Sequence, residues 1–303
     1  TASAAHAAAH LCNAANAVRA LAWLPRPPTA AADSAEGDDA EYLAVGTSVH
    51  HGGEPQPPSA HAIQLWRMVG GSCALWGEVV HGGCGVLALG WRPYGNALTA
   101  AAAEASAMAD GQAAVDRLGL LAAGCADGHI RIFAIPTAAP ADAPATPTGD
   151  PRRDPASAAA WRLWLPPAVI LHAVGAAVPL CIDWAAAAAA GGGTQLAAGT
   201  SDGCLVLWRV DRASLIASAP AAEAQDEDEP QDASWCDNRT AYKAFMPAVV
   251  WGGAPCNPPD ECDGGSTSRD VRAGHTGPVR AVQWAPPPSA LVASVGHDGT
   301  LLL

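Results

Sequence analysis

The stretch LAAGCADGHIRIF at residues 121–133 recurs as LAAGTSDGCLVLW at residues 196–208. Each copy runs from an apolar stretch through small residues and an Asp-Gly pair to an alternating stretch that ends on an aromatic residue. Alternation with a period of two is typical of a β-strand, and Gly supplies the positive φ that a hairpin turn requires. The stretch therefore predicts two strands joined by a two-residue turn at Asp127-Gly128. The same turn is predicted at Asp202-Gly203 and at Asp298-Gly299.

A second phrase recurs upstream of these hairpins and ends on Trp23, Trp91, Trp184 and Trp284. Each Trp follows a short alternating apolar stretch and precedes a strand of small residues, such as EYLAVGTS at 41–48. An alternating outer strand comes next. The sequence thus contains four copies of one all-β unit, and because one such sheet cannot bury both faces alone, the copies are expected to stack. Core packing explains the four Trp residues better than an aromatic cage does.

Strand repeats that follow a His-Gly or Gly-His pair and end on Trp resemble the WD40 β-propeller. In that family a His before the unit, a Ser or Thr of its second strand, the turn Asp and the outer-strand Trp share a hydrogen-bond network. The resemblance implies structural roles for His81, Asp127, His172, Asp202, Trp208, His275, Ser294, Asp298 and Trp66. The networks are incomplete, because Ala198 and Ala123 replace the hydroxyl and Phe133 replaces a Trp.

The predicted blades lie at about 17–69, 78–136, 161–210 and 241–303, after an Ala-rich segment at 1–16. Successive Asp-Gly turns are 75 and 96 residues apart, whereas WD40 units measure roughly 40 to 45 residues. The excess is assigned to insertions at 29–40, 97–116, 137–160 and 211–270. Within the last, TAYKAFMPAVVW (240–251) could supply a strand of a neighbouring blade. Since closed propellers have roughly four to eight blades, we expect the protein to continue past Leu303 and to close at about seven.

Composition and motifs argue against several functions. A net charge of −13 argues against direct nucleic-acid binding, which needs clustered Lys and Arg. Of the 29 acidic residues, fifteen fall within 33–41, 223–237 and 260–263, where a solvated loop is the favoured interpretation and a basic partner the lesser one. No apolar run reaches the eighteen residues of a membrane span.

Catalysis and cofactor binding have little support in the sequence. There is no nucleophile elbow, P-loop, zinc-protease or dinucleotide motif, so no catalytic or cofactor-binding residue is predicted. The nine cysteines lack a Cys-x-x-Cys pair, and Cys236, Cys256 and Cys262 have no suitable His beside them, so no metal site is predicted either. Cys125, Cys181 and Cys204 are interpreted as small buried apolar residues with free thiols.

A closer resemblance covers residues 18–303. The phrases ALAWLPRPP, EYLAVGTS and IQLW of the first unit, followed by RLGLLAAGCADG (117–128), are similar to the WD40 propeller of the transcription factor IIIC polypeptide 2 family. That resemblance implies a nuclear, non-enzymatic scaffold in a multisubunit complex that recognises tRNA-gene promoters and recruits RNA polymerase III. DNA would then be contacted mainly through companion subunits, with no small-molecule substrate and no membrane. A basic N-terminal extension typical of that family does not occur here.

Two other interaction functions stay open at the level of sequence. A generic WD40 adaptor, such as a ubiquitin-ligase substrate receptor or a trafficking module, is the main alternative. A propeller that reads histones or other peptides is the weaker one and would need an acidic or aromatic central channel. Fold alone does not choose between them.

Overall fold

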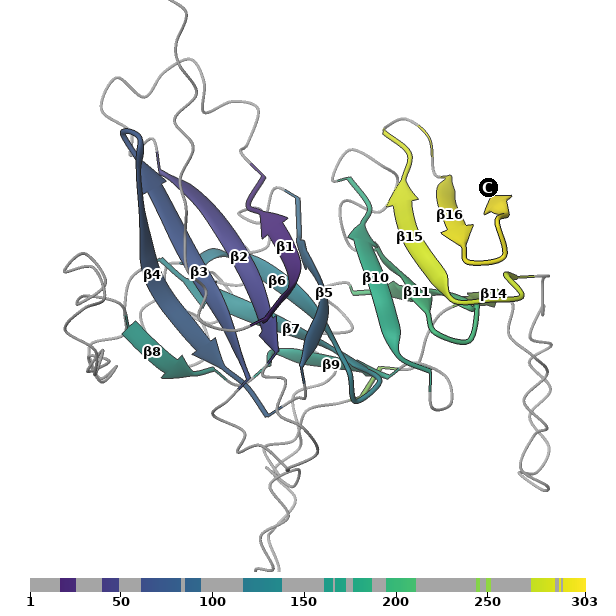
Figure 1. Cartoon of the computed structure of the whole chain (residues 1–303), viewed down its shortest axis with the longest axis horizontal. Helices are drawn as coiled ribbons and strands as arrows, with labels where there is room; N and C mark the ends of the chain where they lie inside the picture. The colour runs from purple at the N-terminus through teal and green to yellow at the C-terminus, as the bar shows by residue number, and fades with distance from the viewer. Residues whose placement is uncertain are drawn as a thin grey trace, which may run out of the picture.

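The computed structural model confirms the all-β prediction (Figure 1). It describes residues 17–25, 40–48, 61–82, 85–93, 117–137, 161–165, 167–172, 177–186, 195–210, 244–245, 249–251, 274–286, 289 and 291–303. These residues form strands and turns without a helix. The strands make four sheets, which we number from first to fourth along the chain.

Each of the first three sheets has an antiparallel meander of four strands, and the fourth has three strands within the described residues. The first sheet contains β1 (Ala17–Trp23), β2 (Glu41–Ser48), β3 (Ala62–Val69), β4 (Ser72–Val80) and β8 (Trp161–Trp164). The second contains β5 (Val86–Trp91), β6 (Arg117–Cys125), β7 (His129–Pro136), β9 (Val169–His172) and β13 (Ala244–Phe245). The third contains β10 (Pro179–Trp184), β11 (Gln195–Thr200), β12 (Leu205–Arg209) and β14 (Val249–Trp251). The fourth contains β15 (Val279–Trp284), β16 (Val292–Gly296) and β17 (Leu301–Leu302).

The innermost strand of every sheet carries the same irregularity. Its pairing with the next strand shifts by one residue just after Val18, Val86, Pro179 and Val279, which is the signature of a β-bulge. A bulge at one equivalent position in all four sheets shows that they are copies of one structural unit.

The sheets pack face to face in chain order through three apolar clusters. The first cluster joins the first and second sheets around Ile63, Trp91 and Phe133. The second and third clusters join the second sheet to the third and the third to the fourth. Alternation places apolar side chains on both faces of each inner sheet, so burial against two neighbours is what stabilises the meanders. This stack is consistent with consecutive blades of a β-propeller.

Four strands belong to an earlier sheet than the predicted blade limits assign them to, namely β8, β9, β13 and β14. The sequence assigns 161–164 to the third blade, but β8 pairs in parallel with β4 at the outer edge of the first sheet. Likewise β13 pairs in parallel with β9 of the second sheet. In chain order β8 comes just before β9, the outer strand of the second sheet, and β13 comes just before β14, the outer strand of the third sheet. In both places the chain adds a short strand to the earlier sheet before it forms the outer strand of the next one. The segment 240–251 thus contributes a strand to a neighbouring sheet, as its composition predicts.

Gly77 explains how β8 fits so closely against the first sheet. A Cβ atom at this position would lie 2.2 Å from Cε2 of Trp161. The glycine therefore lets the Trp161 ring lie directly on the backbone of β4, where the ring is 4% exposed. The Trp76 ring meets it edge to face with centroids 5.2 Å apart.

Candidate functional site

The repeated polar residues of this chain lie at the hairpins between the second and third strands of each unit. The structure corrects the predicted two-residue turns to three-residue loops, such as Ala126 to Gly128 between β6 and β7. In each loop the Gly N–H donates to the residue three positions earlier, at 3.1 to 3.2 Å, and the Gly φ is +74° to +89°. A type I turn followed by a left-handed Gly has this geometry. Each turn therefore needs its Gly, as predicted, but contains three residues instead of the predicted two.

The turn Asp makes the same contact in all three loops and so has a local role. Its Oδ1 accepts a hydrogen bond from the backbone N–H two residues later, at 3.2 Å from His129, 3.3 Å from Cys204 and 3.0 Å from Thr300. This is the usual way an Asp side chain closes a turn. Closure of the turn, rather than catalysis, accounts for the recurrence of Asp127, Asp202 and Asp298.

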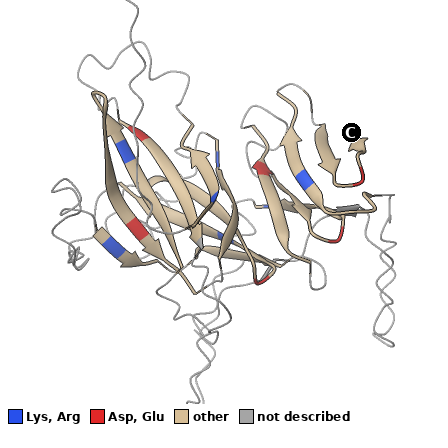
Figure 2. Cartoon of the chain, in the orientation of Figure 1, with Lys and Arg blue, Asp and Glu red and all other residues tan. Residues whose placement is uncertain are grey.

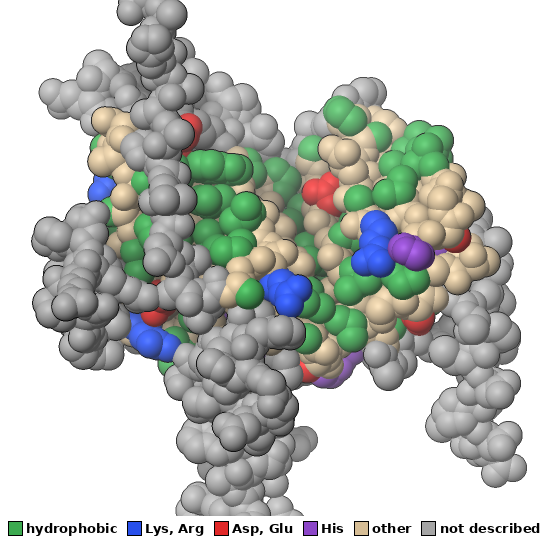
Figure 3. All heavy atoms as spheres, viewed as in Figure 1, with side chains coloured by type: hydrophobic (Ala, Val, Ile, Leu, Met, Phe, Trp, Pro, Cys, Tyr) green, Lys and Arg blue, Asp and Glu red, His purple; other side chains and the backbone are tan. Residues whose placement is uncertain are grey.

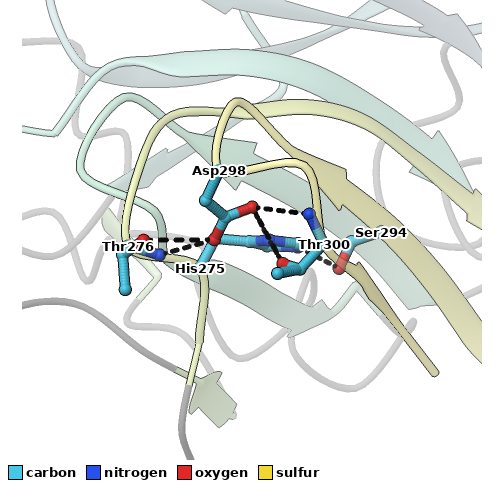
Figure 4. A network of polar contacts seen from close by, with 5 residues as sticks. All are labelled: His275, Thr276, Ser294, Asp298 and Thr300. Carbon is cyan, nitrogen blue, oxygen red and sulfur yellow. Dashed lines mark hydrogen bonds and ion pairs between the residues drawn. The ribbon is translucent and has the colours of Figure 1, made fainter.

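The fourth unit brings the predicted His275, Ser294 and Asp298 together in one partly buried network (Figure 4). His275 Nε2 lies 3.0 Å from Ser294 Oγ, and Nδ1 lies 3.1 Å from Asp298 Oδ1. Thr300 adds its hydroxyl at 2.8 Å from both His275 Nδ1 and Asp298 Oδ1. Thr276 donates its backbone N–H to Asp298 Oδ2 at 2.8 Å. Sequence reasoning missed both threonines, because each is recognisable only by its distance from the His and Asp.

These three residues have the connectivity of a Ser-His-Asp triad, so a catalytic interpretation has to be weighed. The His275 side chain is fully buried and Ser294 is 2% exposed, which leaves no approach for a substrate to the hydroxyl. Hydrogen bonds from Thr300 and Thr276 hold the pKa of Asp298 well below its usual range, so the carboxylate stays charged as an acceptor. The network therefore fixes the hairpin against the segment that precedes β15.

The second unit uses its Asp differently, because its partner is Arg131. Arg131 donates to both Asp127 oxygens, at 3.0 and 2.7 Å. Burial alone would raise the pKa of Asp127, but hydrogen bonds from His129 and Arg131 outweigh it and hold that pKa well below its usual range. His81 is completely buried at the end of β4, with its ring centroid 5.8 Å from that of Phe133. Phe133 thus occupies the position of the family Trp as an aromatic neighbour of the His.

The third unit replaces its His by a threonine. A Cβ at Gly296 would lie 2.3 Å from His275 Nδ1, so a larger residue there would have to displace the imidazole. Thr200 stands at the equivalent position, and its Oγ1 bonds to Asp202 Oδ1 and to the Cys204 carbonyl. Its hydroxyl bonds to the turn Asp of the third unit, as the His275 ring does in the fourth. The equivalent Thr47 of the first unit makes the same contact, to the Ala62 carbonyl at 2.9 Å.

His172 is the predicted residue whose surroundings differ most from the prediction. It ends β9 directly opposite His129 of β7, and the two rings meet edge to face at 4.3 Å. Burial lowers the pKa of His172, and the neighbouring His129 and Arg131 lower it further. The structure therefore places His172 with the turn of the second unit, while Asp202 pairs with Thr200 and Cys204.

The ring N–H groups of Trp66 and Trp208 lack the Ser or Thr acceptor that the family network would supply. Trp66 donates its ring N–H to Gln64 of the same strand at 3.3 Å. Trp208 is 1% exposed, and among the described residues its Nε1 has no acceptor. Ala198 lies on the same face of the third sheet, in the same apolar cluster. The missing hydroxyl at Ala198 thus coincides with an unsatisfied buried donor, which costs about 1 to 3 kcal/mol.

Replacing Ala198 by Ser is expected to raise the free energy of unfolding by about 1 kcal/mol, because the new hydroxyl can accept from Trp208 Nε1. Urea unfolding followed by fluorescence measures the change. In a Trp208→Phe background the donor is gone, so the same substitution should give no gain. Equal gains in both backgrounds would show that the hydroxyl does not pair with Trp208.

Other site chemistry is limited in the described part of the chain. Cys125 and Cys204 are buried and Cys181 is partly buried, each as a thiol outside any disulfide, and burial raises the pKa of Cys181 to about 11. Cys236, Cys256 and Cys262 lie outside the described residues. The described ranges contain no cluster of three or more His, Cys, Asp or Glu side chains that could hold a metal. Within those same ranges, no helix has the length and apolarity to cross a bilayer.

Comparison with known proteins identifies one repeat. Residues 267–303 match the family "WD domain, G-beta repeat", so the unit that contains the contacts of His275 with Ser294 and Asp298 is a WD40 repeat. No curated protein matches the chain. Among solved structures, the crystal structure of the computationally designed Ika4 protein is similar at 12% identity and a TM-score of 0.39. That similarity covers 97% of this chain and 93% of the other.

Proposed function

We propose that this chain is a non-enzymatic scaffold for protein–protein interactions. The WD40 repeat supports an interaction role in general. The observation that carries the proposal is that the side chains of His275, Ser294 and Asp298 bond to one another and fix a hairpin, with His275 and Ser294 buried. Such a platform is rigid, and its loops and edges remain to contact partners.

We further propose that the scaffold belongs to a transcription factor IIIC complex in the nucleus and supports tRNA-gene recognition and RNA polymerase III initiation. The support is the resemblance of residues 18–303, above all the phrases of the first unit and RLGLLAAGCADG. Partners would be the other subunits of that complex.

The charge distribution favours indirect contact with DNA. The described residues contain eight arginines against six carboxylates, and Figure 2 shows these charges dispersed over the sheets rather than gathered in a stripe. The other 23 of the 29 acidic residues lie outside the described ranges. Because a duplex is held by clustered cations, we assign the DNA contacts to companion subunits.

Affinity purification of the tagged protein with mass spectrometry, together with chromatin immunoprecipitation, tests both the scaffold role and the transcription factor IIIC assignment. We expect transcription factor IIIC subunits in the eluate and occupancy at tRNA genes. Recovery of ubiquitin-ligase or coat subunits instead would contradict the transcription assignment and favour a generic WD40 adaptor. A purified chain that binds no protein partner and turns over a small substrate would overturn the scaffold itself.

A further inference from the structure

Two histidines of the second sheet meet where neighbouring strands end. His129 is the first residue of β7 and His172 is the last residue of β9, and the two lie directly opposite each other in the antiparallel register. Opposite residues of antiparallel strands place their side chains on one face of the sheet. The two imidazole rings accordingly meet edge to face, with centroids 4.3 Å apart. Both residues are partly exposed, and Figure 3 shows histidine surface at the lower rim of the molecule, where Figure 1 places these strand ends.

The turn before β7 fixes which nitrogen of His129 is available to a ligand. Its Nδ1 lies 3.0 Å from the Asp127 carbonyl oxygen. A carbonyl only accepts, so Nδ1 carries a proton and the neutral ring has its lone pair at Nε2. Metal-binding histidines are usually oriented in this way, by a hydrogen bond from the other ring nitrogen to a carbonyl or carboxylate. The contact with Asp127 therefore prepares Nε2 of His129 as a metal ligand.

The charged side chains beside the two histidines compensate each other. Asp127 and Arg131 act on His172 with opposite sign, and they form an ion pair with each other at 2.7 Å. Burial lowers the pKa of His172, and the neighbouring His129 and Arg131 lower it further. Its imidazole is therefore neutral at pH 7, which is the form that binds a metal ion. A cation at the two rings would meet nitrogen ligands without a net positive charge beside them.

We propose that His129 and His172 together bind one divalent transition metal ion, Zn²⁺ or a similar ion, with water completing its coordination. Imidazole suits Zn²⁺, Cu²⁺ and Ni²⁺, whereas Mg²⁺ and Ca²⁺ take oxygen ligands. Two imidazoles with Zn–N bonds of about 2.0 to 2.1 Å place their ring centroids roughly 4.5 to 5 Å apart. The rings of this pair, at 4.3 Å, need to separate by less than about 1 Å to reach that geometry. The ion would fasten the end of β9, which pairs with β7 through four residues, to the hairpin of the second unit.

Calorimetric titration of the EDTA-treated 303-residue protein with ZnCl₂ tests the site. The chain has ten histidines and nine cysteines, so the informative quantity is the difference between each variant and the unaltered protein. His129→Gln and His172→Gln should each weaken zinc binding at this site by roughly 10-fold or more, since each removes one of two ligands. Because both ligands hold one ion, the double variant should bind zinc about as weakly as either single variant. His297→Gln removes an exposed histidine of the fourth unit and should leave the affinity unchanged.

Hydrogen exchange of the unaltered protein gives a measurement that needs no substitution. Zn²⁺ should slow the exchange of the amides of β9 and of the start of β7, because the ion holds the strand ends together, and Mg²⁺ at the same concentration should not. If zinc binding survives both single substitutions, or if their losses add in the double variant, the two histidines do not share an ion and the proposal is wrong. Equal exchange of β9 with and without Zn²⁺ would also contradict it and would leave the two rings as an aromatic contact only.

Discussion

Replacing Gly203 by Ala is expected to lower the free energy of unfolding by about 3 kcal/mol or more. The residue has φ of +89°, which costs an L-amino acid about 1 to 2 kcal/mol. The added Cβ would lie 2.2 Å from the His275 carbonyl oxygen and 3.0 Å from that of Gly277. Since backbone atoms cannot rotate away, the segment before β15 must move, and overpacking of this kind adds about 1 to 3 kcal/mol.

The strain would reach the network of the fourth unit directly. The Gly203 carbonyl accepts the His275 N–H at 3.2 Å, so a shift of this segment displaces the imidazole from Ser294 and Asp298. We therefore expect the third and fourth sheets to separate at lower denaturant concentration than in the unaltered protein. Urea unfolding followed by Trp fluorescence measures the total loss.

Gly299→Ala is the matched control, because it changes the same position of the fourth unit. Its φ is +74°, but nothing lies within 4 Å of the added Cβ. We expect a loss of only about 1 kcal/mol, from the backbone conformation alone. Equal losses at the two glycines would show that the contact with His275 carries no energy and that φ decides both.

Local sequence signals predict the parts of this structure that depend on neighbouring residues. The period of two predicts the strands, and the Asp-Gly pairs predict the hairpins together with their left-handed glycines. The resemblance to WD40 repeats, rather than a local pattern, implies the contacts of His275 with Ser294 and Asp298 that the fourth unit shows. The loop length was wrong by one residue, since Asp-Gly suits both the two-residue and the three-residue turn.

Long-range contacts could not be predicted in the same way. The parallel pairing of β8 with β4 brings Gly77 next to Trp161, which is far away in the sequence, and no local sequence pattern indicates this contact. Thr200 bonds to the turn Asp at the position where the fourth unit has Gly296, and this difference is visible only when the two units are compared in space. The exposure of Trp23 is also invisible in the sequence, where the same phrase surrounds it as surrounds the three buried Trp residues.

Acidification from pH 7 to pH 5 is expected to cost the protein about 2 kcal/mol of stability through His81 alone. Burial lowers the pKa of His81 to about 4, and repulsion from Arg131 and His61 outweighs the opposing effect of Asp127. An unfolded His binds its proton near pH 6.5, so protonation favours the unfolded chain between pH 6.5 and pH 4. The stabilising effect of the neutral, buried ring is fully present above pH 6.5 and is lost as the pH falls from 6.5 to 4.

Replacing His81 by Asn removes this titration and isolates its share of the pH dependence. His61 and His172 also have pKa values lowered by burial and act in the same direction, so the difference between protein and variant is the informative quantity. We expect His81→Asn to be less stable at pH 7, where a buried ring beside Phe133 is lost, but to lose about 2 kcal/mol less than the unaltered protein on acidification to pH 5. His81→Gln should give the same smaller pH dependence, because the effect belongs to the proton rather than to the shape of the side chain. If either variant keeps the full pH dependence, the proton is bound elsewhere and His81 is not the group that titrates.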